Sequence, residues 1–301
     1  MPQTINTNIA SLNAQRNLNS SQGSLSVAMQ RLSSGLRVNS AKDDAAGLAI
    51  AERMNTQVRG MTVAMRNAND GISLAQTAEG ALGKISDALQ RMRELTVQSR
   101  NATNSASDKD SLDKEFQQLA GEITRIMGAT SFNGKPILND PSGLPQVYQI
   151  GANTSSWDTI DVPALDLPQD AAVGALIPPG GTPVSIGAAT DAGTASSVPR
   201  PTPTDATGLA KVIDDIDDAL TVINNTRATF GAVQSRFDAV ISNLQISVEN
   251  QSAARSRIMD ADYAAETSQL SRAQILQQAG NAMVAQANQL PQQVLSLLRG
   301  G

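Results

Sequence analysis

Apolar residues recur every three or four positions along a long stretch that begins near residue 50. The repeat comprises Ile50, Met54, Val58, Met61, Met65, Ala68, Ile72, Ala75, Ala78, Leu82, Ile85, Leu89, Met92 and Leu95. This spacing places the side chains on one face of an α-helix. No proline interrupts the stretch, and Ser40-Ala41-Lys42-Asp43 before it resembles a capping box. We therefore predict a helix over about 46–101, roughly 80 Å long at ~1.5 Å per residue.

A helix of that length cannot be buried in a small globule, so it must pack against other long helices. Two further stretches, 108–127 and 209–248, carry apolar residues at helical spacing. Their apolar positions are Leu112, Phe116, Leu119, Ile123 and Ile126 in the first, and Ile213, Ile216, Leu220, Ile223, Phe230, Phe237 and Leu244 in the second. We expect these stretches to be antiparallel and parallel partners in one bundle.

The middle of the chain has a different pattern, because eleven of the thirteen prolines lie between residues 136 and 203. Short alternating runs at 147–150 and 159–162 indicate strands, and Asn133-Gly134 is a typical hairpin turn. Residues 168–203 have the composition of a short, loop-like and variable surface region. The predicted fold class is mainly α: a long antiparallel/parallel helical bundle with coiled-coil terminal helices and a small β-hairpin/loop outer region.

The two ends share helical spacing and a low content of charge. Residues 1–40 contain three arginines and no acidic residue, and residues 263–299 contain only Glu266, Arg272 and Arg299 as charges. A helix that carries few charges on any face is normally surrounded by other protein. One pair of helices cannot surround itself, so other copies of the chain must do so. Leu290-Pro291 is expected to break the last helix.

We predict three parts from these patterns. Residues 1–40 and 257–301 form a terminal helical pair, 41–167 and 204–256 form a helical bundle with short β elements, and 168–203 form the variable surface region. The apolar residues expected to carry assembly are Ile5, Ile9, Leu12, Leu25, Leu32, Leu36, Ile275, Leu290, Val294, Leu297 and Leu298.

The composition excludes several kinds of chemistry. The chain has no cysteine and no histidine, which excludes thiolate nucleophiles, Cys or His metal sites and histidine acid–base catalysis. Paired acids such as Asp43 with Asp44, or Asp260 with Asp262, fall at expected helix starts, where capping explains them. We expect no enzymatic activity, no catalytic residues, no cofactor and no metal.

Charge and hydropathy bear on partners and location. The net charge is −5, which argues against binding of nucleic acid. No uninterrupted apolar stretch approaches the ~20 residues of a membrane helix, so we expect no membrane insertion. The first residues have neither a basic region nor an apolar core and do not resemble a cleaved signal peptide. If the chain leaves the cell, it uses another route.

Long motifs at both ends resemble bacterial flagellin, and the resemblance covers roughly 1–155 and 205–301. At the start these are Ile5-Asn6-Thr7-Asn8, Ser11-Leu12-Asn13-Ala14-Gln15-Arg16-Asn17-Leu18, Arg31-Leu32-Ser33-Ser34-Gly35-Leu36-Arg37 and Ser40-Ala41-Lys42-Asp43-Asp44. At the end they are Asp260-Ala261-Asp262-Tyr263-Ala264, Gln274-Ile275-Leu276-Gln277-Gln278-Ala279-Gly280 and Val294-Leu295-Ser296-Leu297-Leu298-Arg299. Several motifs in the right order make the resemblance highly specific.

The resemblance implies a structural subunit that polymerises into the flagellar filament for motility. In that family the terminal pair forms the inner filament core and the bundle forms an outer tube. The implied partners are other subunits, an export chaperone and the export apparatus, and the filament cap and hook–filament junction proteins. Subunits are exported unfolded, so the implied location is secreted, extracellular and in the bacterial flagellum. The export chaperone is expected at the apolar tail 294–298.

The resemblance also implies a receptor site. Gln90-Arg91-Met92-Arg93-Glu94-Leu95 is similar to the flagellin segment recognised by the flagellin-sensing Toll-like receptor of vertebrates. It implies receptor contacts for Arg91, Leu95 and Glu115. Arg91 and Leu95 are one turn apart and are expected to share a face. The same residues can instead serve filament contacts, and both roles are compatible in a surface that the polymer hides.

Several alternatives remain open. Gly60, Gly71, Gly80 and Gly83 within the long helix either give packing space, which we favour, or act as soft points for filament switching. The nearest alternative function is the hook–filament junction protein. A zinc-protease insert needs a His-Glu-x-x-His site, which this chain cannot form. An intracellular coiled-coil scaffold would carry charged flanking positions that the ends lack.

Overall fold

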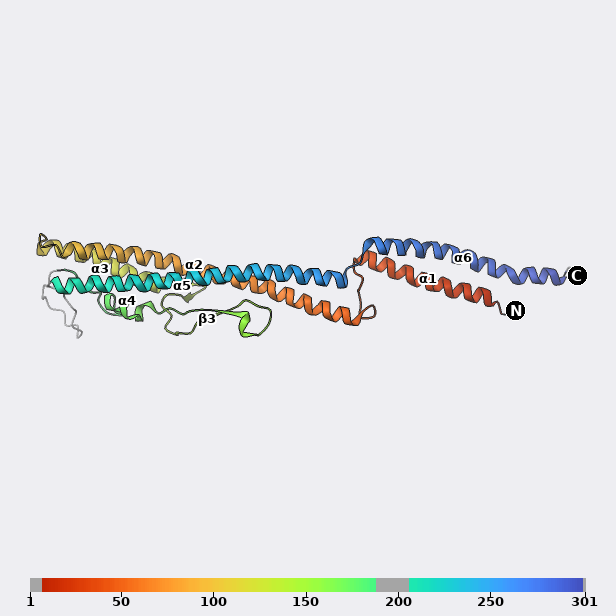
Figure 1. Ribbon diagram of the computed structural model, residues 1–301, viewed down its shortest axis with the longest axis horizontal. Coiled ribbons are helices and arrows are strands. Elements are labelled where there is room, and N and C mark those ends of the chain that lie inside the picture. Colours follow the sequence, from red (N-terminus) through yellow and green to blue (C-terminus); the bar gives the residue numbers. More distant parts are fainter. Residues whose placement is uncertain (1–6, 188–205, 300–301) are drawn as a thin grey trace. The chain divides into compact units, whose positions relative to one another are not determined.

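The computed structural model describes the backbone of residues 7–187 and 206–299 and the side chains of residues 7–187 and 208–289. Its helices are α1 (Ile9–Ser34), α2 (Ala45–Ser99), α3 (Ala106–Ala129), α4 (Ala171–Leu176), α5 (Ala206–Met259) and α6 (Tyr263–Arg299) (Figure 1). Its strands are β1 (Ser131–Phe132), β2 (Lys135–Pro136), β3 (Gln146–Gln149) and β4 (Thr159–Val162), with 3-10 turns η1 (Ser156–Asp158) and η2 (Leu167–Gln169). The predicted mainly α class is confirmed.

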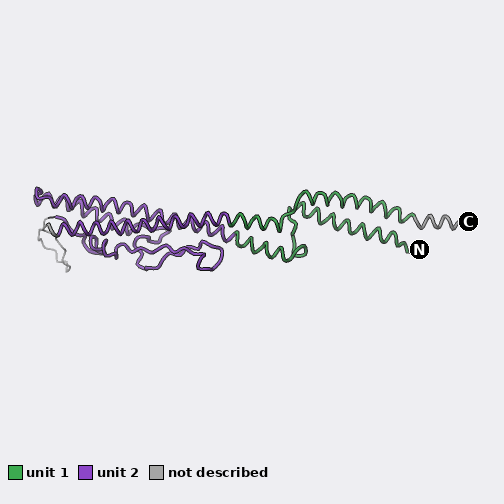
Figure 2. Tube along the Cα trace, viewed as in Figure 1, with its two compact units in different colours: residues 1–58, 247–301 green, residues 59–246 purple. Residues whose placement is uncertain are grey.

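The chain divides into two compact units (Figure 2). Unit 1 comprises Met1–Val58 and Ser247–Gly301, and unit 2 comprises Arg59–Ile246. The predicted boundaries near residues 40 and 257 both fall inside unit 1. The three-part division of the chain therefore stays a prediction.

Unit 2 is built around a bundle of α2, α3 and α5. Its α3 follows α2 after a short loop, so these helices are antiparallel neighbours. On α5, Asp217 pairs with Arg93 of α2 and Gln234 bonds Glu79, so α5 also runs antiparallel to α2 and parallel to α3. The largest fully buried side chains of this unit are Phe116, Phe230, Phe237, Leu82, Ile85, Met92, Leu95, Ile123, Met127, Leu138, Ile160 and Leu176.

The helix starts are capped by acidic and hydroxyl side chains. At α3, the Ser105 hydroxyl accepts from the Asp108 N–H and the Asp108 carboxylate accepts from the Ser105 N–H, which is the reciprocal capping box. At α2, the predicted capping residues Ser40 and Asp43 instead close a separate turn. The helix begins one residue after Asp44, whose carboxylate accepts from the Gly47 N–H at 2.8 Å. The observed N-cap, Asp44, therefore lies four residues after Ser40, the N-cap of the predicted capping box.

Two antiparallel strand pairs confirm the predicted β elements. Asn133 and Gly134 have φ angles of 50° and 77° and turn β1 back onto β2. Strand β3 pairs with β4 so that Val147 lies opposite Asp161 and Tyr148 opposite Ile160. Tyr148 points towards the bundle, where its ring meets Phe237 edge to face at 5.7 Å between centroids.

The interpretation of 168–203 as a loop-like surface region is wrong for its described part. Residues 171–176 form α4, and this segment buries apolar side chains in the core: Val173, Leu176, Ile177, Val184 and Ile186. The Asp113 carboxylate on α3 accepts from Ser185 Oγ at 2.8 Å and from the Ile186 N–H at 2.7 Å. Prolines exclude a long helix here but do not prevent burial. Residues 188–203 lie outside the described residues.

The predicted break at Leu290-Pro291 is also wrong, because α6 continues to Arg299. Proline removes one backbone N–H and crowds the carbonyl four residues earlier. The neighbouring glutamines and leucines are good helix formers. The single missing hydrogen bond therefore does not end this helix.

The glycines of α2 fall into two classes. A methyl group at Gly71 would lie 2.5 Å from Cζ of Phe237, and one at Gly60 would lie 2.8 Å from Cβ of Ala152. These positions give close approach, which is the packing role that we favoured. Gly80 and Gly83 have no such neighbour within 4 Å. The structure therefore gives those two glycines no packing reason.

We expect Gly71→Ala to destabilise the folded monomer by about 1–3 kcal/mol, because the buried Phe237 ring has to shift. Gly80→Ala is the matched control on the same helix. It should stabilise the monomer by about 0.5–1 kcal/mol, because alanine restricts the unfolded chain and meets no neighbour. Denaturant unfolding followed by circular dichroism measures both. A Gly71→Ala variant as stable as Gly80→Ala would contradict the close approach.

Candidate functional site

The helices α1 and α6 form an antiparallel pair within unit 1. At one end of the pair the Asn8 side-chain amide donates to the Ala287 carbonyl at 2.7 Å. At the other end the Tyr263 hydroxyl donates to the Leu32 carbonyl at 3.3 Å. These bonds connect side chains to backbone at both ends, so they fix the register of the pair.

The α1 ends are defined by local chemistry. Asn8 caps the first turn by accepting from the Ser11 N–H at 3.0 Å, and Gly35 ends the helix in the left-handed conformation at φ 71°. Beyond it, Arg37 donates its backbone N–H to the Met259 carbonyl at 2.6 Å. Val38, Ala51 and Met259 then form a small buried cluster at the base of the pair.

The pair buries one charge. Glu266 on α6 is only 6% exposed, and its carboxylate lies 3.7 Å from the half-buried guanidinium of Arg31 on α1. Such an ion pair contributes little net stability, since desolvation opposes the attraction. The ion pair instead helps to set the register of α1 against α6, because only one alignment of the two helices brings the charges together.

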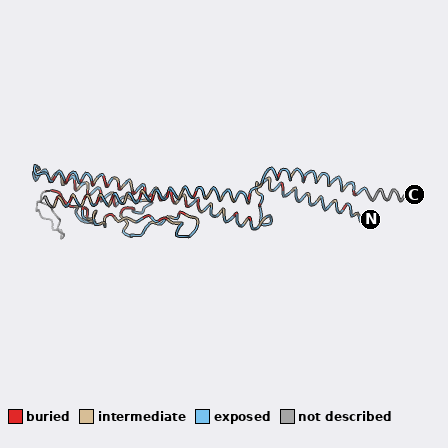
Figure 3. Tube along the Cα trace, viewed as in Figure 1, coloured by how far each residue is buried: buried red, intermediate tan, exposed pale blue. Residues whose placement is uncertain are grey.

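Apolar burial between α1 and α6 is sparse (Figure 3). The buried residues of the described part of the pair are small or polar: Ser11, Ala28, Glu266, Ala273 and Ala287. The large apolar side chains face outwards instead: Ile9 is 66% exposed, Leu12 51%, Met29 56%, Ile275 66%, Leu276 50% and Met283 63%. So many exposed large apolar side chains on one helix pair make the pair a candidate interaction site.

The predicted assembly residues fall into three groups. Ile9, Leu12 and Ile275 are exposed, whereas Leu25, Leu32 and Leu36 are half-buried against the rest of unit 1. Ile5 lies outside the described residues, and Leu290, Val294, Leu297 and Leu298 lie on α6 with side chains that are not described. The list of assembly residues omits the exposed Val27, Met29, Leu276 and Met283. Met29 lies on the stripe of Leu25 and Leu32, whereas Val27 and Leu276 lie on other sides of their helices, which following one apolar stripe does not identify.

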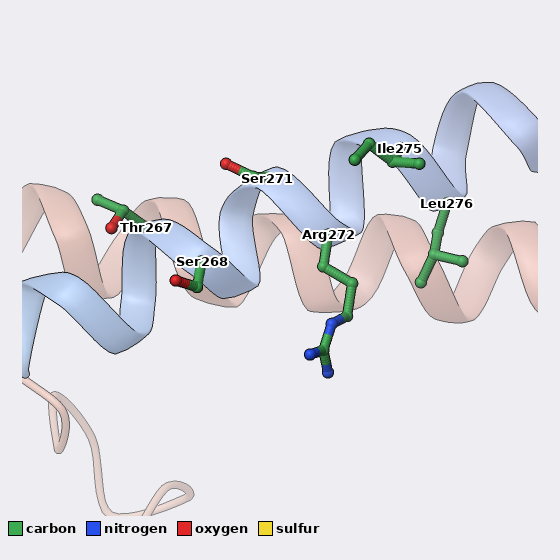
Figure 4. Close-up of a pocket in the computed structure, with 6 residues that line it drawn as sticks. All are labelled: Thr267, Ser268, Ser271, Arg272, Ile275 and Leu276. Carbon is green, nitrogen blue, oxygen red and sulfur yellow. The ribbon is translucent and has the colours of Figure 1, made fainter.

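A shallow groove of about 560 Å³ runs along α6 in this surface (Figure 4). Its lining residues form two adjacent rows with a spacing of about one turn: Thr267, Ser271 and Ile275 in one, and Ser268, Arg272 and Leu276 in the other. Along the helix, three hydroxyls are followed by one cation and then by two apolar side chains. A facing helix of similar composition would fit such a lining.

A second surface lies where α2 faces α3 in unit 2. The Arg91 guanidinium bonds Glu115 at 2.8 Å and Glu94 at 2.9 Å, and all three side chains are exposed. The hydrogen bond that Arg91 donates to Glu115, followed by the one that it donates to Glu94, raises the pKa of Arg91. Leu95 is 0% exposed and belongs to the core, so the expected surface face shared by Arg91 and Leu95 is not formed. Residues four apart differ in direction by about 40° around the helix axis. Leu95 therefore points further towards the core than Arg91 does.

Neighbouring residues on α2 line a groove of about 490 Å³: Gln90, Arg93, Glu94, Val97 and Gln98. Arg93 is held by two hydrogen bonds to Asp217 of α5, at 2.7 and 3.1 Å. Val97 is 50% exposed in this groove. The groove therefore combines a fixed guanidinium with an accessible apolar side chain.

The paired acids act as caps and turns. Asp262 accepts from the Ala264 N–H at 2.9 Å at the start of α6, and Asp260 accepts from the Ser256 hydroxyl. Within the described residues, no group of three or more acidic, histidine or cysteine side chains could hold a metal ion. None of the described helices is both long and apolar enough to cross a membrane.

The solved structure of a putative flagellar hook-associated protein from Vibrio parahaemolyticus resembles this fold, with a TM-score of 0.56. It shares 13% sequence identity and covers 72% of this chain and 100% of that one. At that identity the likeness concerns the fold alone.

Sequence comparisons are more specific. The family model for the bacterial flagellin N-terminal helical region matches residues 5–142, and the one for the C-terminal helical region matches residues 213–298. A flagellin of Halalkalibacterium halodurans is 45% identical over 295 residues, covering 98% of this chain and 99% of the relative. A flagellin of Serratia marcescens is 45% identical over 354 residues, covering 99% of this chain and 100% of the relative. With both helical regions matched and nearly the whole chain aligned, this protein belongs to the bacterial flagellin family.

Proposed function

We propose that this chain assembles through the outward faces of its α1–α6 pair. As a flagellin, it is a structural subunit of the bacterial flagellar filament. The observation that carries the proposal is the exposure of large apolar side chains along a pair with few charges, including Ile9, Ile275 and Met283. Neighbouring copies would remove this surface from water, and each 100 Å² of apolar surface buried contributes roughly 2.5 kcal/mol.

The same observation supports export in an unfolded form. The pair has a small buried core of alanines and polar groups, so opening it exposes little additional apolar surface. We infer that the pair acquires stable structure only on assembly. An export chaperone would then bind the tail that includes residues 294–298 before secretion to the cell exterior. The filament cap and the hook–filament junction proteins would present further copies of the same helical surfaces.

The role that we infer is purely structural. The acidic side chains of Asp44, Asp108 and Asp262 cap helix starts. We therefore propose no enzymatic activity and no cofactor. A hook–filament junction role is less well supported, because the curated relatives are flagellins that match this chain over nearly its whole length.

We also propose that the monomer is recognised by the flagellin-sensing Toll-like receptor through Arg91 and Glu115. The pair is exposed, and its hydrogen bonds hold the guanidinium in one orientation. Leu95 is buried, so it would contribute indirectly, by packing beneath the part of α2 that carries Arg91. An ordered arginine beside a groove is a common hot spot of protein interfaces.

The polymerisation proposal is tested by electron microscopy of the full chain beside variants that lack residues 1–40 or 262–301. We expect filaments from the full chain and none from either variant, because each deletion removes one helix of the pair. Circular dichroism should show that the truncated chains keep the helical bundle of unit 2. Filaments formed by a truncated chain would contradict the proposal.

The receptor proposal is tested by the potency of monomers on cells that carry the receptor. Arg91→Ala should lower potency about thirtyfold or more, which corresponds to the loss of a hot-spot contact. Arg125→Ala is the matched control, because Arg125 also makes an exposed ion pair, with Glu122 on α3. Its potency should stay at the wild-type value. An inert wild-type monomer, or equal potency of the two variants, would contradict the proposal.

A further inference from the structure

The single tryptophan of the chain has no role in the monomer's core. Trp157 is 90% exposed in η1, between β3 and β4. Val147 on β3 is 61% exposed, and Leu144 just before the strand is 70% exposed. Residues 146–162, here called the Trp157 hairpin, thus present Val147 and Trp157 to solvent. Tryptophan is usually well buried on average, so its exposure calls for an explanation.

The loop that carries Trp157 is held in one conformation. The Ser155 hydroxyl accepts from the Trp157 N–H, and the Asp158 carboxylate accepts from the Ser155 N–H at 3.2 Å. The Gln149 side-chain amide donates to the Gly151 and Asn153 carbonyls at 3.0 and 2.7 Å. A loop whose backbone is ordered before binding loses less conformational entropy in a complex.

The Trp157 hairpin is also fixed to the bundle. Asn67 of α2 donates its side-chain amide to the Gln149 carbonyl at 2.9 Å. Tyr148 packs against Phe237 of α5, and Gly60 allows the close approach of Ala152. These contacts use the inner side of the hairpin. Trp157 is therefore held away from the core of its own unit.

A matching surface is present near the end of α2 in the same unit. The groove lined by Gln90, Arg93, Glu94, Val97 and Gln98 has a volume of about 490 Å³. Because Asp217 fixes the Arg93 guanidinium, that group can stack on an indole without losing further freedom. Val97 supplies an apolar side chain that is 50% exposed. The groove therefore has the two features that favour an aromatic occupant.

One exposed charge on each surface makes no ion pair in the described part of the chain. The Trp157 hairpin carries Asp158 and Asp161 and no basic residue. Of the three arginines in residues 90–100, Arg91 is paired with Glu94 and Glu115 and Arg93 with Asp217, which leaves Arg100. Asp161 and Arg100 are exposed, and neither makes an ion pair within the described part of the chain. Complementary charges around an apolar contact favour one orientation of the partners.

The groove and the Trp157 hairpin cannot meet within one copy. Asn67, which anchors the hairpin, lies in the first half of the part of α2 that belongs to unit 2. The groove is lined by residues 90–98, near the end of the same helix. At ~1.5 Å per residue, Asn67 and Arg93 are roughly 40 Å apart along α2. A contact between two different surfaces of identical subunits is heterologous, and such contacts generate open helical polymers when the rotation between subunits does not close a ring. The occupant that fits the groove is therefore the hairpin of a second copy.

We propose that Trp157 is an assembly contact, which inserts into the groove around Arg93 and Val97 of the next copy in the polymer. Asp161 of the first copy then lies towards Arg100 of the next. This inference rests on the proposed polymerisation and names a contact outside the α1–α6 pair.

The test uses the full chain and the fluorescence of its single tryptophan. In the monomer the emission should be that of an indole in water and should be quenched by acrylamide. On polymerisation we expect a blue shift and a loss of quencher access. Trp157→Ala should raise the critical concentration for polymerisation about thirtyfold or more, with an unchanged melting temperature of the monomer. Trp157→Phe should recover part of the loss.

Val97→Asp tests the other half of the contact. It should raise the critical concentration as much as Trp157→Ala does, and the double variant should be little worse than either single variant. The control is Val63→Ala, a change on α2 of a valine that is 45% exposed and lies outside both surfaces. Its critical concentration should match that of the wild type.

The outcomes separate this inference from the proposed function. A wild-type chain that fails to polymerise overturns both. A wild-type chain that polymerises while Trp157 keeps its quencher access overturns the contact alone, and that result does not depend on any variant folding. Additive effects of Trp157→Ala and Val97→Asp overturn the assignment of the groove as the binding surface.

Discussion

The rest of the structure depends on one constraint: two helices cannot cover each other on all sides. The α1–α6 pair lacks the charges that keep an isolated surface helix soluble, yet it buries mainly alanines, a serine and Glu266. Large apolar side chains of its described part stay exposed to water in the monomer: Ile9, Leu12, Met29, Ile275, Leu276 and Met283. Hydrogen bonds such as Asn8 to Ala287 and the Arg31–Glu266 ion pair set the register of the pair without supplying a core. Burial must come from other copies.

Unit 2 solves the same packing problem within one chain. The bundle of α2, α3 and α5 surrounds a core of leucines, isoleucines and phenylalanines, and Gly71 lets the Phe237 ring lie against α2. The segment with α4 and the residues that Asp113 holds adds further apolar cover. A unit with its own core can stay folded as a monomer. It can therefore carry defined surface features, such as the Arg91–Glu115 pair and the Trp157 hairpin, before assembly.

The sequence predicted the elements whose signals are periodic or local. The spacing from Ile50 to Leu95 predicted α2, and Asn133-Gly134 predicted the β1–β2 turn. It could not place side chains whose environment depends on distant packing. Leu95 is one turn from Arg91 but lies in the core because α3 and α5 cover that side of the helix. Prolines near 168–187 suggested a surface loop, but the segment packs Leu176 and Ile186 into the core. The helix α6 continues past Pro291, where the neighbouring residues are good helix formers.

Hydrogen exchange of the backbone amides, compared between monomer and filament, tests most directly whether the terminal pair depends on other copies. In the monomer we expect rapid exchange over Ile9–Ser34 and over α6, and slow exchange over the buried part of α2 between residues 68 and 96. In the filament we expect both terminal helices to become as protected as α2. Equal protection of α1 and α6 in monomer and filament would contradict the view that other copies supply their missing burial.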